Sequence, residues 1–247
     1  MVSILEGIRA QVPVPAKRAA RLVRRALKAA TGTDHWIGCN VSMPKRRYGN
    51  DWADWIVANQ YLTPASVVYS FGLGRDVSFE QELVTDIGCK VLGFDPTPIS
   101  MDYVRSLGEV GNFRAFPYAL STFDGIKSFG LPEEGDVSFT TKDVKRGAVE
   151  LPVRTLVSLM AEMGDDHIDL LKMDIEGEEY AVIDDMLAHG IIPRQLLIEF
   201  HHAWGIASLS DTKAALIKLG DAGYRIFDVS AAGREFSFIH CSLLSKA

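Results

Sequence analysis

The stretch that decides the fold is VVYSFGLGRDVSFEQELVTDIGCKVLGFDP, Val67 to Pro96. It opens with an apolar run rich in β-forming residues and continues through the glycine pair Gly72 and Gly74. A helical pattern follows, and a second apolar run ends at Asp95. Strand, glycine turn, helix and strand in this order are typical of an open α/β sheet, whose ligands bind at the carboxyl ends of the strands.

The same alternation of strands and helices continues to the C-terminus. Strands are predicted at 67–71, 90–94, 113–120, 168–173, 195–200, 224–229 and 235–241. Helices are predicted at 78–87, 99–107, 155–163, around 182–187 and at about 210–222. Only SAAGR separates the last two strands, which is too short for a parallel crossover. The sequence therefore predicts an α/β fold with a mostly parallel sheet and an antiparallel strand in a C-terminal hairpin.

Two regions interrupt or precede this pattern. Residues 1–32 form a predicted basic helical appendage, and 33–247 a single domain in which 121–153 is an inserted hairpin or flap. Ser78 and Gln81 have capping-box spacing at the start of the first helix. The segment 35–55, which holds three tryptophans, is interpreted either as a lid over a pocket or as an aromatic-rich helix on the sheet edge.

Charge is distributed unevenly along the chain. The formal net charge is -6, yet residues 1–30 hold seven Lys or Arg against Glu6 alone, so the remainder carries 19 basic and 31 acidic residues. An acidic body argues against nucleic acid as the main ligand. The basic helix leaves two interpretations open, a weak contact of residues 15–30 with an anionic membrane surface and a solvated appendage.

The cysteines and the apolar runs indicate the compartment. Cys39, Cys89 and Cys241 lie far apart, a spacing that suggests neither a disulfide framework nor a zinc cluster. No apolar run reaches the roughly 18 to 20 residues needed to cross a bilayer, and the start lacks the apolar core of a signal peptide. We expect a soluble, cytoplasmic protein.

The glycine pair and Asp95 together indicate a nucleoside-containing cofactor. Asp95 lies 21 residues after Gly74, where an acid can accept hydrogen bonds from a ribose diol. Val77 stands where a dinucleotide-binding loop has its third glycine, and the terminal hairpin is a second feature that disfavours nicotinamide. An NAD-type oxidoreductase remains an alternative, as does a non-catalytic cofactor-binding protein associated with membranes through its N-terminus.

Five segments resemble the FkbM family of class I S-adenosylmethionine methyltransferases. In order, they are VVYSFGLGRDVSFEQEL, VLGFDPTP, FPYALS, IDLLKMDIEGEEYAVI and LLIEFHH, and the likeness covers about Tyr48 to Cys241. The resemblance implies a Rossmann-like sheet and methyl transfer from S-adenosylmethionine, usually to a hydroxyl of a sugar, polyketide or related metabolite. It therefore implies a small hydroxylated acceptor as the partner.

Nine residues are expected to contact the cofactor, and the resemblance assigns the glycine loop, the ribose acid and the adenine wall among them. They are Phe71, Gly72, Gly74, Asp76, Asp95, Ala119, Leu120, Ser121 and Asp174. Gly72 and Gly74 match the cofactor loop, Asp95 the ribose acid, and 119–121 a wall near the adenine. The chain departs from the methyltransferase pattern at Ser70, where an acid is common, so Asp76 or Asp174 is expected to accept the methionine amino group.

Four carboxylates crowd the stretch LLKMDIEGEEY, Leu170 to Tyr180. Asp174 and Glu176 follow a strand at the ligand-binding edge of the sheet, and both are candidate site residues. Glu178 and Glu179 are expected in the first turn of the next helix, where they complement the helix dipole and meet water without a catalytic role.

The fifth predicted strand ends in Glu199-Phe-His201-His202, beside Asp174 in the sheet. Transfer to a hydroxyl requires removal of its proton, so His201 is the preferred general base, and Asp174, Glu199 and Glu176 are further catalytic candidates. A divalent cation on Asp174, Glu199 and His201 is an alternative, but no metal is predicted. Transfer driven by orientation alone is another.

Overall fold

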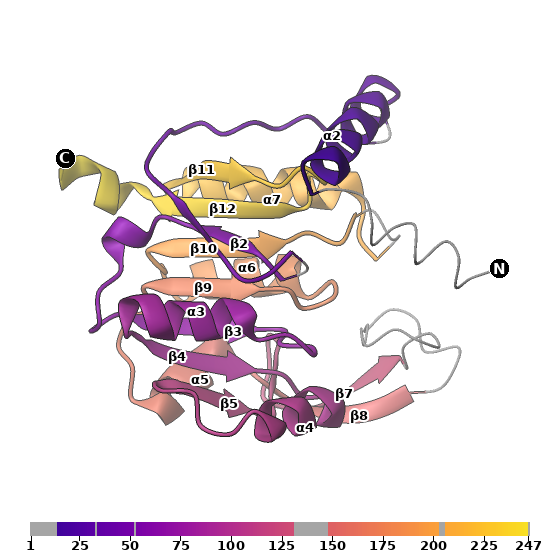
Figure 1. Cartoon of the computed structure of the whole chain (residues 1–247). Coiled ribbons are helices and arrows are strands. Elements are labelled where there is room, and N and C mark those ends of the chain that lie inside the picture. The colour runs from indigo at the N-terminus through magenta and orange to yellow at the C-terminus, as the bar shows by residue number, and fades with distance from the viewer. Residues whose placement is uncertain (1–13, 33, 52, 131–147, 203–205, 247) are drawn as a thin grey trace.

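A seven-stranded sheet forms the centre of the molecule (Figure 1). The computed structural model describes residues 14–32, 34–51, 53–130, 148–202 and 206–246. The strand order is β11-β12-β10-β9-β3-β4-β5. The bounds are β3 Val67–Phe71, β4 Lys90–Phe94, β5 Phe113–Phe116, β9 Leu170–Met173, β10 Gln195–Glu199, β11 Tyr224–Val229 and β12 Glu235–His240.

Six of these strands run in one direction and β12 runs in the other. β12 pairs antiparallel with both β10 and β11, whereas β3, β4, β5, β9 and β10 pair in parallel. The five residues between β11 and β12 permit only a reversal. This order, with one reversed strand next to the edge, confirms the predicted class I methyltransferase-type sheet.

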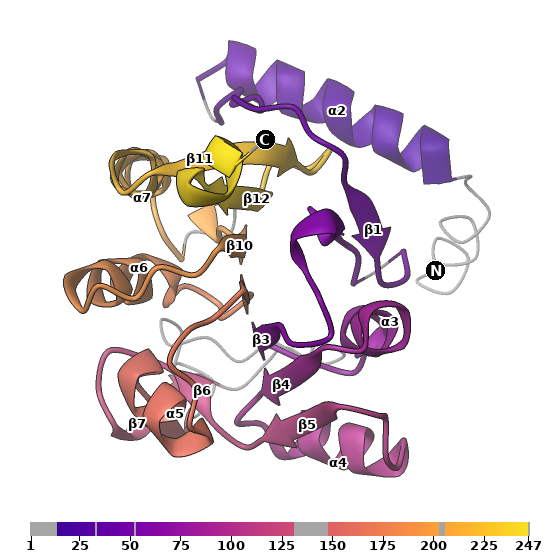
Figure 2. The same cartoon turned by 90° about the vertical axis from the view of Figure 1, so that its left-hand side faces the viewer.

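Helices cover both faces of the sheet (Figure 2). One face carries α3 and α4, and the other carries α5, α6 and α7. Their bounds are α3 Ser78–Ile87, α4 Pro98–Ser106, α5 Leu156–Met163, α6 Glu179–Ala188 and α7 Leu209–Asp221. Thr97, Thr155 and Ser208 cap α4, α5 and α7 by accepting hydrogen bonds from backbone amides.

The predicted capping box of α3 is wrong. Val77 is the N-cap and makes no side-chain cap hydrogen bond, and Asp76 Oδ1 instead accepts from the Ser78 amide at 2.9 Å. An aspartate two residues before the first turn can reach that amide, which leaves the Ser78 hydroxyl to accept from the Asn50 amide.

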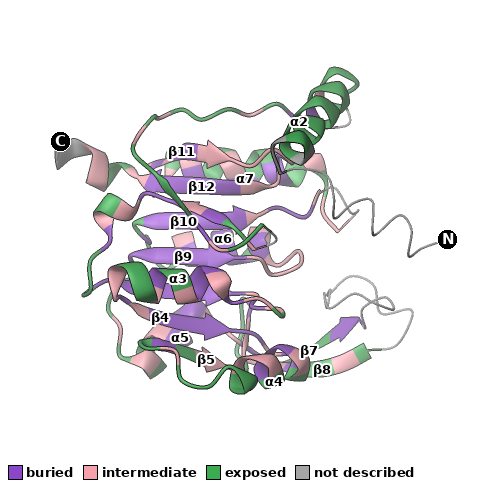
Figure 3. Ribbon diagram, in the orientation of Figure 1, coloured by how far each residue is buried: buried purple, intermediate pink, exposed green. Residues whose placement is uncertain are grey.

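The central strands are buried on both sides (Figure 3). In β3, Tyr69 and Phe71 belong to the core beneath α5, α6 and α7, while Val68 packs in the second core with α3. Apolar residues at every position are expected of parallel strands covered on both faces. Burial of this kind fixes the strand register, and with it the position of the strand ends that form the site.

A smaller sheet lies beyond β5. The predicted strand 113–120 is wrong as one unit, because Pro117 separates β5 from β6 Ala119–Leu120. β6 pairs in parallel with β8 Ala148–Arg154, and β8 pairs antiparallel with β7 Gly125–Gly130. The described part of the predicted insertion 121–153 therefore contains a hairpin, and 131–147 lie outside the described residues.

The N-terminal region packs on the C-terminal hairpin. Helix α2, Val14–Ala30, lies beside β11 and β12 (Figures 1 and 2). Arg25 is 4% exposed and donates to the carbonyls of Ile37 at 2.8 Å and Ser230 at 3.4 Å. Leu22, Val23 and Leu27 are exposed on α2, and contact of this helix with a membrane surface stays a prediction.

The described residues of 35–55, all but residue 52, do not form the aromatic-rich helix that was one of the two interpretations. β1 Arg46–Tyr48 and β2 Trp55–Val57 form an antiparallel hairpin there, joined around Gly49. A further 3-10 turn, η1, covers Asn59–Tyr61, and another, η3, covers Cys241–Lys246. Within the described part of the chain, none of the helices combines the length and apolar character required to cross a bilayer.

Gly72→Ala is expected to destabilise the fold strongly. Gly72 has φ +82°, and a Cβ there would lie 2.0 Å from the Asp174 carbonyl oxygen, so we expect a loss of roughly 3 kcal/mol or more in urea unfolding. Gly74→Ala is the matched control, because φ is +56° and nothing lies within 4 Å; only left-handed strain of about 1 kcal/mol is expected. Equal losses would contradict a close contact at Gly72.

Candidate functional site

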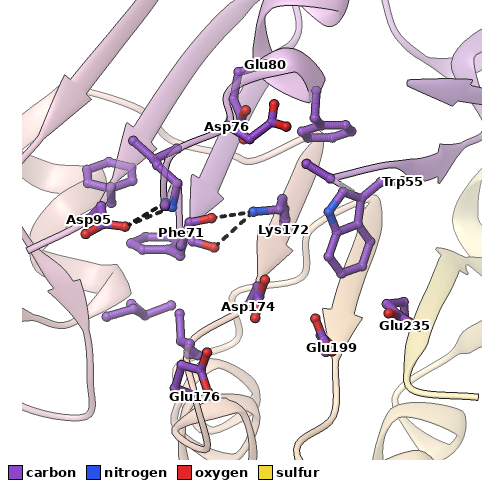
Figure 4. A pocket seen from close by; sticks show the side chains of 18 of the residues that line it. Trp55, Phe71, Asp76, Glu80, Asp95, Lys172, Asp174, Glu176, Glu199 and Glu235 are labelled. Carbon is purple, nitrogen blue, oxygen red and sulfur yellow. Dashed lines mark hydrogen bonds between the residues drawn. The ribbon is translucent and has the colours of Figure 1, made fainter. Parts of the chain in front are cut away.

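A cavity of about 460 Å³ opens at the carboxyl ends of β3, β4, β9 and β10 (Figure 4). Among the described residues, ten carboxylate side chains line it against four cationic ones, so the cavity favours a cationic ligand. The acids are Asp51, Asp54, Asp76, Glu80, Asp95, Asp174, Glu176, Glu178, Glu199 and Glu235, and the bases Arg21, Arg75, Lys172 and Arg234.

The glycine turn and Asp95 form one hydrogen-bonded unit. Asp95 Oδ2 accepts from the amides of Leu73 and Gly74, both at 3.0 Å. Its Oδ1 accepts from the Thr97 amide at 2.9 Å and the Thr97 hydroxyl at 2.6 Å. These four donors occupy about as many lone-pair sites as a carboxylate offers. Asp95 therefore holds the turn in shape, and a ribose diol would have to share or displace these bonds.

Lys172 is a site residue that the sequence reasoning did not select. It is 5% exposed, and its Nζ donates to the Gly72 carbonyl at 2.7 Å and lies 3.4 Å from the Phe71 carbonyl (Figure 4). The signal was present in the sequence, because a lysine inside an otherwise apolar strand is seldom buried without a partner. Lys172 ties the end of β9 to the turn after β3.

Glu80 brings a carboxylate to the place where Ser70 departs from the methyltransferase pattern. Its Oε1 accepts from the Ser70 hydroxyl at 2.5 Å, while Oε2 is buried without a hydrogen-bond partner among the described residues. Burial raises the pKa of Glu80, and the nearby Lys172 opposes that rise. Since Glu80 also lines the cavity, its free oxygen can accept from a ligand.

The loop after β9 is built around Glu179, and here the prediction that Glu179 meets water is wrong. Glu179 is 0% exposed, and its carboxylate accepts from the amides of Ile175 at 3.0 Å and Gly177 at 2.9 Å. The loop needs such support, because Glu176 has φ +55°. Glu179 thus determines where Asp174 and Glu176 point.

Glu178 also departs from the predicted solvent-exposed role. It lines the cavity with its side chain only 12% exposed, and its Oε2 accepts from Lys127 Nζ at 2.5 Å and from the Ser121 hydroxyl at 3.2 Å. It lies immediately before the first turn of α6, as the N-cap residue. Glu178 links the cavity wall to the small sheet that contains Lys127.

His201 is a buried cation. It is 3% exposed, and its Nδ1 lies 2.9 Å from Glu179 Oε1, while Nε2 lies 3.4 Å from Glu176 and 3.6 Å from Asp174. Burial alone would lower its pKa, but the hydrogen bond and charge of Glu179, with the charges of Asp174 and Glu176, raise the pKa to about 10. An imidazolium at neutral pH has no lone pair for a substrate proton, so this geometry argues against His201 as the general base.

Three carboxylates instead face the cavity together (Figure 4). Glu199 ends β10 and Glu235 begins β12 directly opposite it in the antiparallel register, and Asp174 follows β9. Burial, with the charges of Asp174 and Glu235, raises the pKa of Glu199 to about 9. Burial likewise raises the pKa of Asp174, against the opposing charges of Lys172 and His201. The Glu199 carboxyl therefore holds its proton to a higher pH than a free glutamate does, and a cationic ligand beside it favours release of that proton.

The structure places most of the predicted site residues on this one cavity. Those that line it are Phe71, Gly72, Gly74, Asp76, Asp95, Ala119, Leu120, Asp174, Glu176 and Glu199. Ser121 lies behind Glu178, and His201 lies behind Asp174 and Glu176. Trp55, Glu80, Lys172, Arg234 and Glu235 line the cavity and were not predicted, because they reach it through contacts distant in sequence.

The possible metal ligands differ from those considered in the sequence. Asp174, Glu176 and His201, rather than Glu199, hold ligand atoms within 4.8 Å of one another. His201 engages all three surrounding carboxylates in ion pairs, so a divalent cation would have to replace the imidazolium proton. These residues are better matched to a proton than to a metal ion.

The strand order and the acid-lined cavity at the sheet edge define a class I methyltransferase fold. The sequence profile of the FkbM methyltransferase domain matches residues 66–226, which is more than half of the chain. The chain belongs to this family, as the resemblance in its motifs predicted.

The individual relatives and solved structures that resemble this chain share only a low sequence identity with it. "Probable methyltransferase-like protein 24" is 26% identical over 164 residues in Rattus norvegicus and 24% in Homo sapiens. Both alignments cover 66% of this chain and 40% of the relative, so the matched segment is under half of those proteins. Aeropyrum pernix fibrillarin, solved with natively bound S-adenosyl-L-methionine, is 11% identical with a TM-score of 0.40, covering 81% of this chain and 83% of that one.

Glu179→Gln is expected to loosen the loop after β9. Glutamine cannot neutralise His201, and its amide nitrogen would face one of the two backbone amides that Glu179 now binds. We expect a loss of about 3 to 5 kcal/mol in urea unfolding. Asp184→Asn, on the same helix as Glu179, removes an exposed ion pair with Lys218 of α7 and should cost less than about 1 kcal/mol. Similar small losses for both variants would refute the structural role of Glu179.

Proposed function

We propose that this chain binds S-adenosylmethionine in the cavity and transfers its methyl group to a hydroxyl of a small metabolite, sugar or glycan. The observation that carries the proposal is an acid-lined cavity resting on a glycine turn at the carboxyl ends of parallel strands. Such a cavity complements a ligand that carries a sulfonium and an ammonium group. Membership of the FkbM methyltransferase family supports the same activity.

The glycine turn and its neighbours offer a complete cradle for the nucleoside. The backbone of Gly72 and Gly74 permits close approach, Asp95 would share its hydrogen bonds between the turn and the ribose, and Ala119 and Leu120 would supply an apolar wall for the adenine. Glu80 Oε2 is our first choice as acceptor for the methionine ammonium, because it is buried and unpaired.

Asp76 is a weaker acceptor for that ammonium. Burial would raise its pKa, but hydrogen bonds from Ser78 and Asn50 outweigh this and lower it. Its carboxylate is therefore already committed to shaping the start of α3 and the β1–β2 connection. Asp174 lies nearer the other carboxylates and is left for the reacting end of the ligand.

The carboxylates Glu199 and Asp174 are proposed to accept the hydroxyl proton. The cofactor would supply an electrophilic methyl group, whose bond to sulfur breaks as the bond to the acceptor oxygen forms. A carboxylate with a raised pKa is a stronger base once ionised, and a neighbouring sulfonium favours that ionised form. His201 is a positioning residue here, because it holds Asp174 and Glu176 without lining the cavity.

S-adenosylmethionine should bind the purified chain, and NADH should not. In calorimetry, Asp95→Ala is expected to weaken S-adenosylmethionine at least tenfold, about 1.4 kcal/mol, because the glycine turn loses its anchor and the ribose its acceptor. Asp102→Ala is the control. It removes an exposed ion pair with Arg105 within α4, and the affinity for S-adenosylmethionine should stay unchanged. Binding of NADH in place of S-adenosylmethionine would support the oxidoreductase alternative.

Glu199→Gln should abolish the pH dependence of methyl transfer. A base must be ionised, so turnover is expected to rise with pH toward the pKa of Glu199, about 9 in the free protein and lower beside a sulfonium. Production of S-adenosylhomocysteine, measured from pH 6 to 9 over a panel of monosaccharides and glycans, tests this. We expect Glu199→Gln to lose at least about 100-fold in kcat.

His201→Gln is the comparison for that measurement. It should reduce turnover through misplacement of Asp174 yet keep the rise with pH, because it leaves Glu199 in place. If His201→Gln instead removed the rise and Glu199→Gln kept it, the histidine would be the base.

A further inference from the structure

A second cluster of ligand-type side chains lies outside the cavity. Asp34 and His35 follow α2, and His202 follows β10, so the cluster joins segments that are far apart in sequence. Their ligand atoms all lie within 4.8 Å of one another. His35 is 6% exposed, and the side chains of Asp34 and His202 are 7% and 4% exposed. None of the three lines the proposed methyltransferase cavity.

Both histidines have buried ring nitrogens without hydrogen-bond partners among the described residues. This applies to Nδ1 and Nε2 of His35, and Nε2 of His202 makes only a long contact of 3.4 Å with Asp34 Oδ1. The two rings lie 5.2 Å apart between centroids. Buried unpaired polar atoms are costly, and each one requires an explanation.

A histidine binds a metal ion through a neutral ring, and burial favours the neutral form at both positions. Burial, reinforced by His202, lowers the pKa of His35 to about 4. Burial also lowers the pKa of His202, against the opposing effect of Asp34. The other nitrogen of His202, Nδ1, lies 3.1 Å from the Thr212 hydroxyl, which in turn lies 2.9 Å from the Tyr180 hydroxyl. When Nδ1 carries the proton and donates it to Thr212, the lone pair of Nε2 faces Asp34.

We propose that Asp34, His35 and His202 bind a divalent transition-metal ion, with Zn²⁺ as the representative. Two imidazoles and one carboxylate suit zinc and its neighbours, which accept nitrogen ligands, whereas Mg²⁺ and Ca²⁺ prefer oxygen alone. A metal ion would bind one ring nitrogen of each histidine and neutralise the Asp34 carboxylate.

Nearby cations set a limit on the affinity. Arg25, Lys28, Lys213 and Arg234 exert charge on one or another member of the cluster. Arg25 is committed to the carbonyls of Ile37 and Ser230, so it remains in place when a metal binds. We therefore expect a site weaker than a thiolate-based zinc centre and more sensitive to pH, because protons compete for the histidines.

The bound metal would fasten the N-terminal arm to the sheet. It would join the segment after α2 to the connection between β10 and α7, one residue beyond His201. Helix α2 carries Arg21, which lines the methyltransferase cavity. The proposed role is structural, and its test does not depend on methyl transfer.

Titration of the full chain with Zn²⁺ and Co²⁺ tests the site. We expect Zn²⁺, at about a hundred times its Kd, to raise the unfolding midpoint by roughly 5 °C, and Co²⁺ to give visible absorption bands typical of nitrogen and oxygen ligation. His35→Ala, His202→Ala and Asp34→Asn should each lose both responses. Asp34→Asn preserves side-chain shape, so a response lost in this variant reports the missing carboxylate ligand and not a loss of packing.

Three controls complete the experiment. His167→Ala and His189→Ala remove histidines whose side chains are 52% and 53% exposed, and both should keep the response. Glu176→Gln alters the other possible ligand cluster and should also keep it. The proposal is overturned if neither metal produces a response in the unaltered chain, if His35→Ala retains it, or if Glu176→Gln alone removes it.

Discussion

The contact between the turn after β3 and the turn after β9 is the constraint on which the site depends. Only a glycine fits at position 72, because the Asp174 carbonyl occupies the space that a side chain would need. Lys172 then binds the carbonyls of Phe71 and Gly72, so both strand ends are fixed relative to each other. The glycine turn and Asp174 are therefore held as one rigid unit, which is the preorganisation that the proposed methyl transfer requires.

Around that unit, the chain concentrates negative charge at a cost in stability. Glu199 and Glu235 face each other across two strands, and like charges in such pairs repel. Holding a proton on the cluster relieves part of this repulsion, as does the cationic His201 beneath Asp174 and Glu176. A bound cationic ligand would offset the remaining repulsion among the carboxylates. Relief of that repulsion would then contribute to the binding free energy of the ligand.

Local sequence patterns predicted the parts of the fold that depend on local structure. The strands from Val67 to Phe71 and from Lys90 to Phe94 have apolar patterns that need no tertiary information, and the reversed β12 follows from a five-residue connection. The break at Pro117 divides a run whose composition is β-like on both sides. Its second half pairs with β8, more than 30 residues away in sequence, a partner that local pattern does not reveal.

The location of the candidate site could be predicted from the sequence, but the roles of its residues only in part. Asp95, Asp174 and Glu199 end strands, and strand ends meet at one edge. The roles of Glu179 and His201 depend on their contact with each other, although they lie 22 residues apart in sequence. Glu179 was expected at the surface but is buried, and it supports the loop after β9. His201 was expected to be a base, but the contact with Glu179 favours its cationic form. Lys172 was visible as an anomaly in an apolar strand, but its acceptors lie about 100 residues away.

Arg25 joins helix α2 to the loop between β11 and β12. Its guanidinium fills the space beside Gly233 and reaches the carbonyl of Ser230, so α2 is seated on the loop that joins the last two strands. That same loop leads into Arg234 and Glu235, which form one side of the cavity, while α2 contributes Arg21. Segments far apart in sequence therefore border the same cavity, and a shift of α2 on that loop would displace Arg21 relative to Arg234.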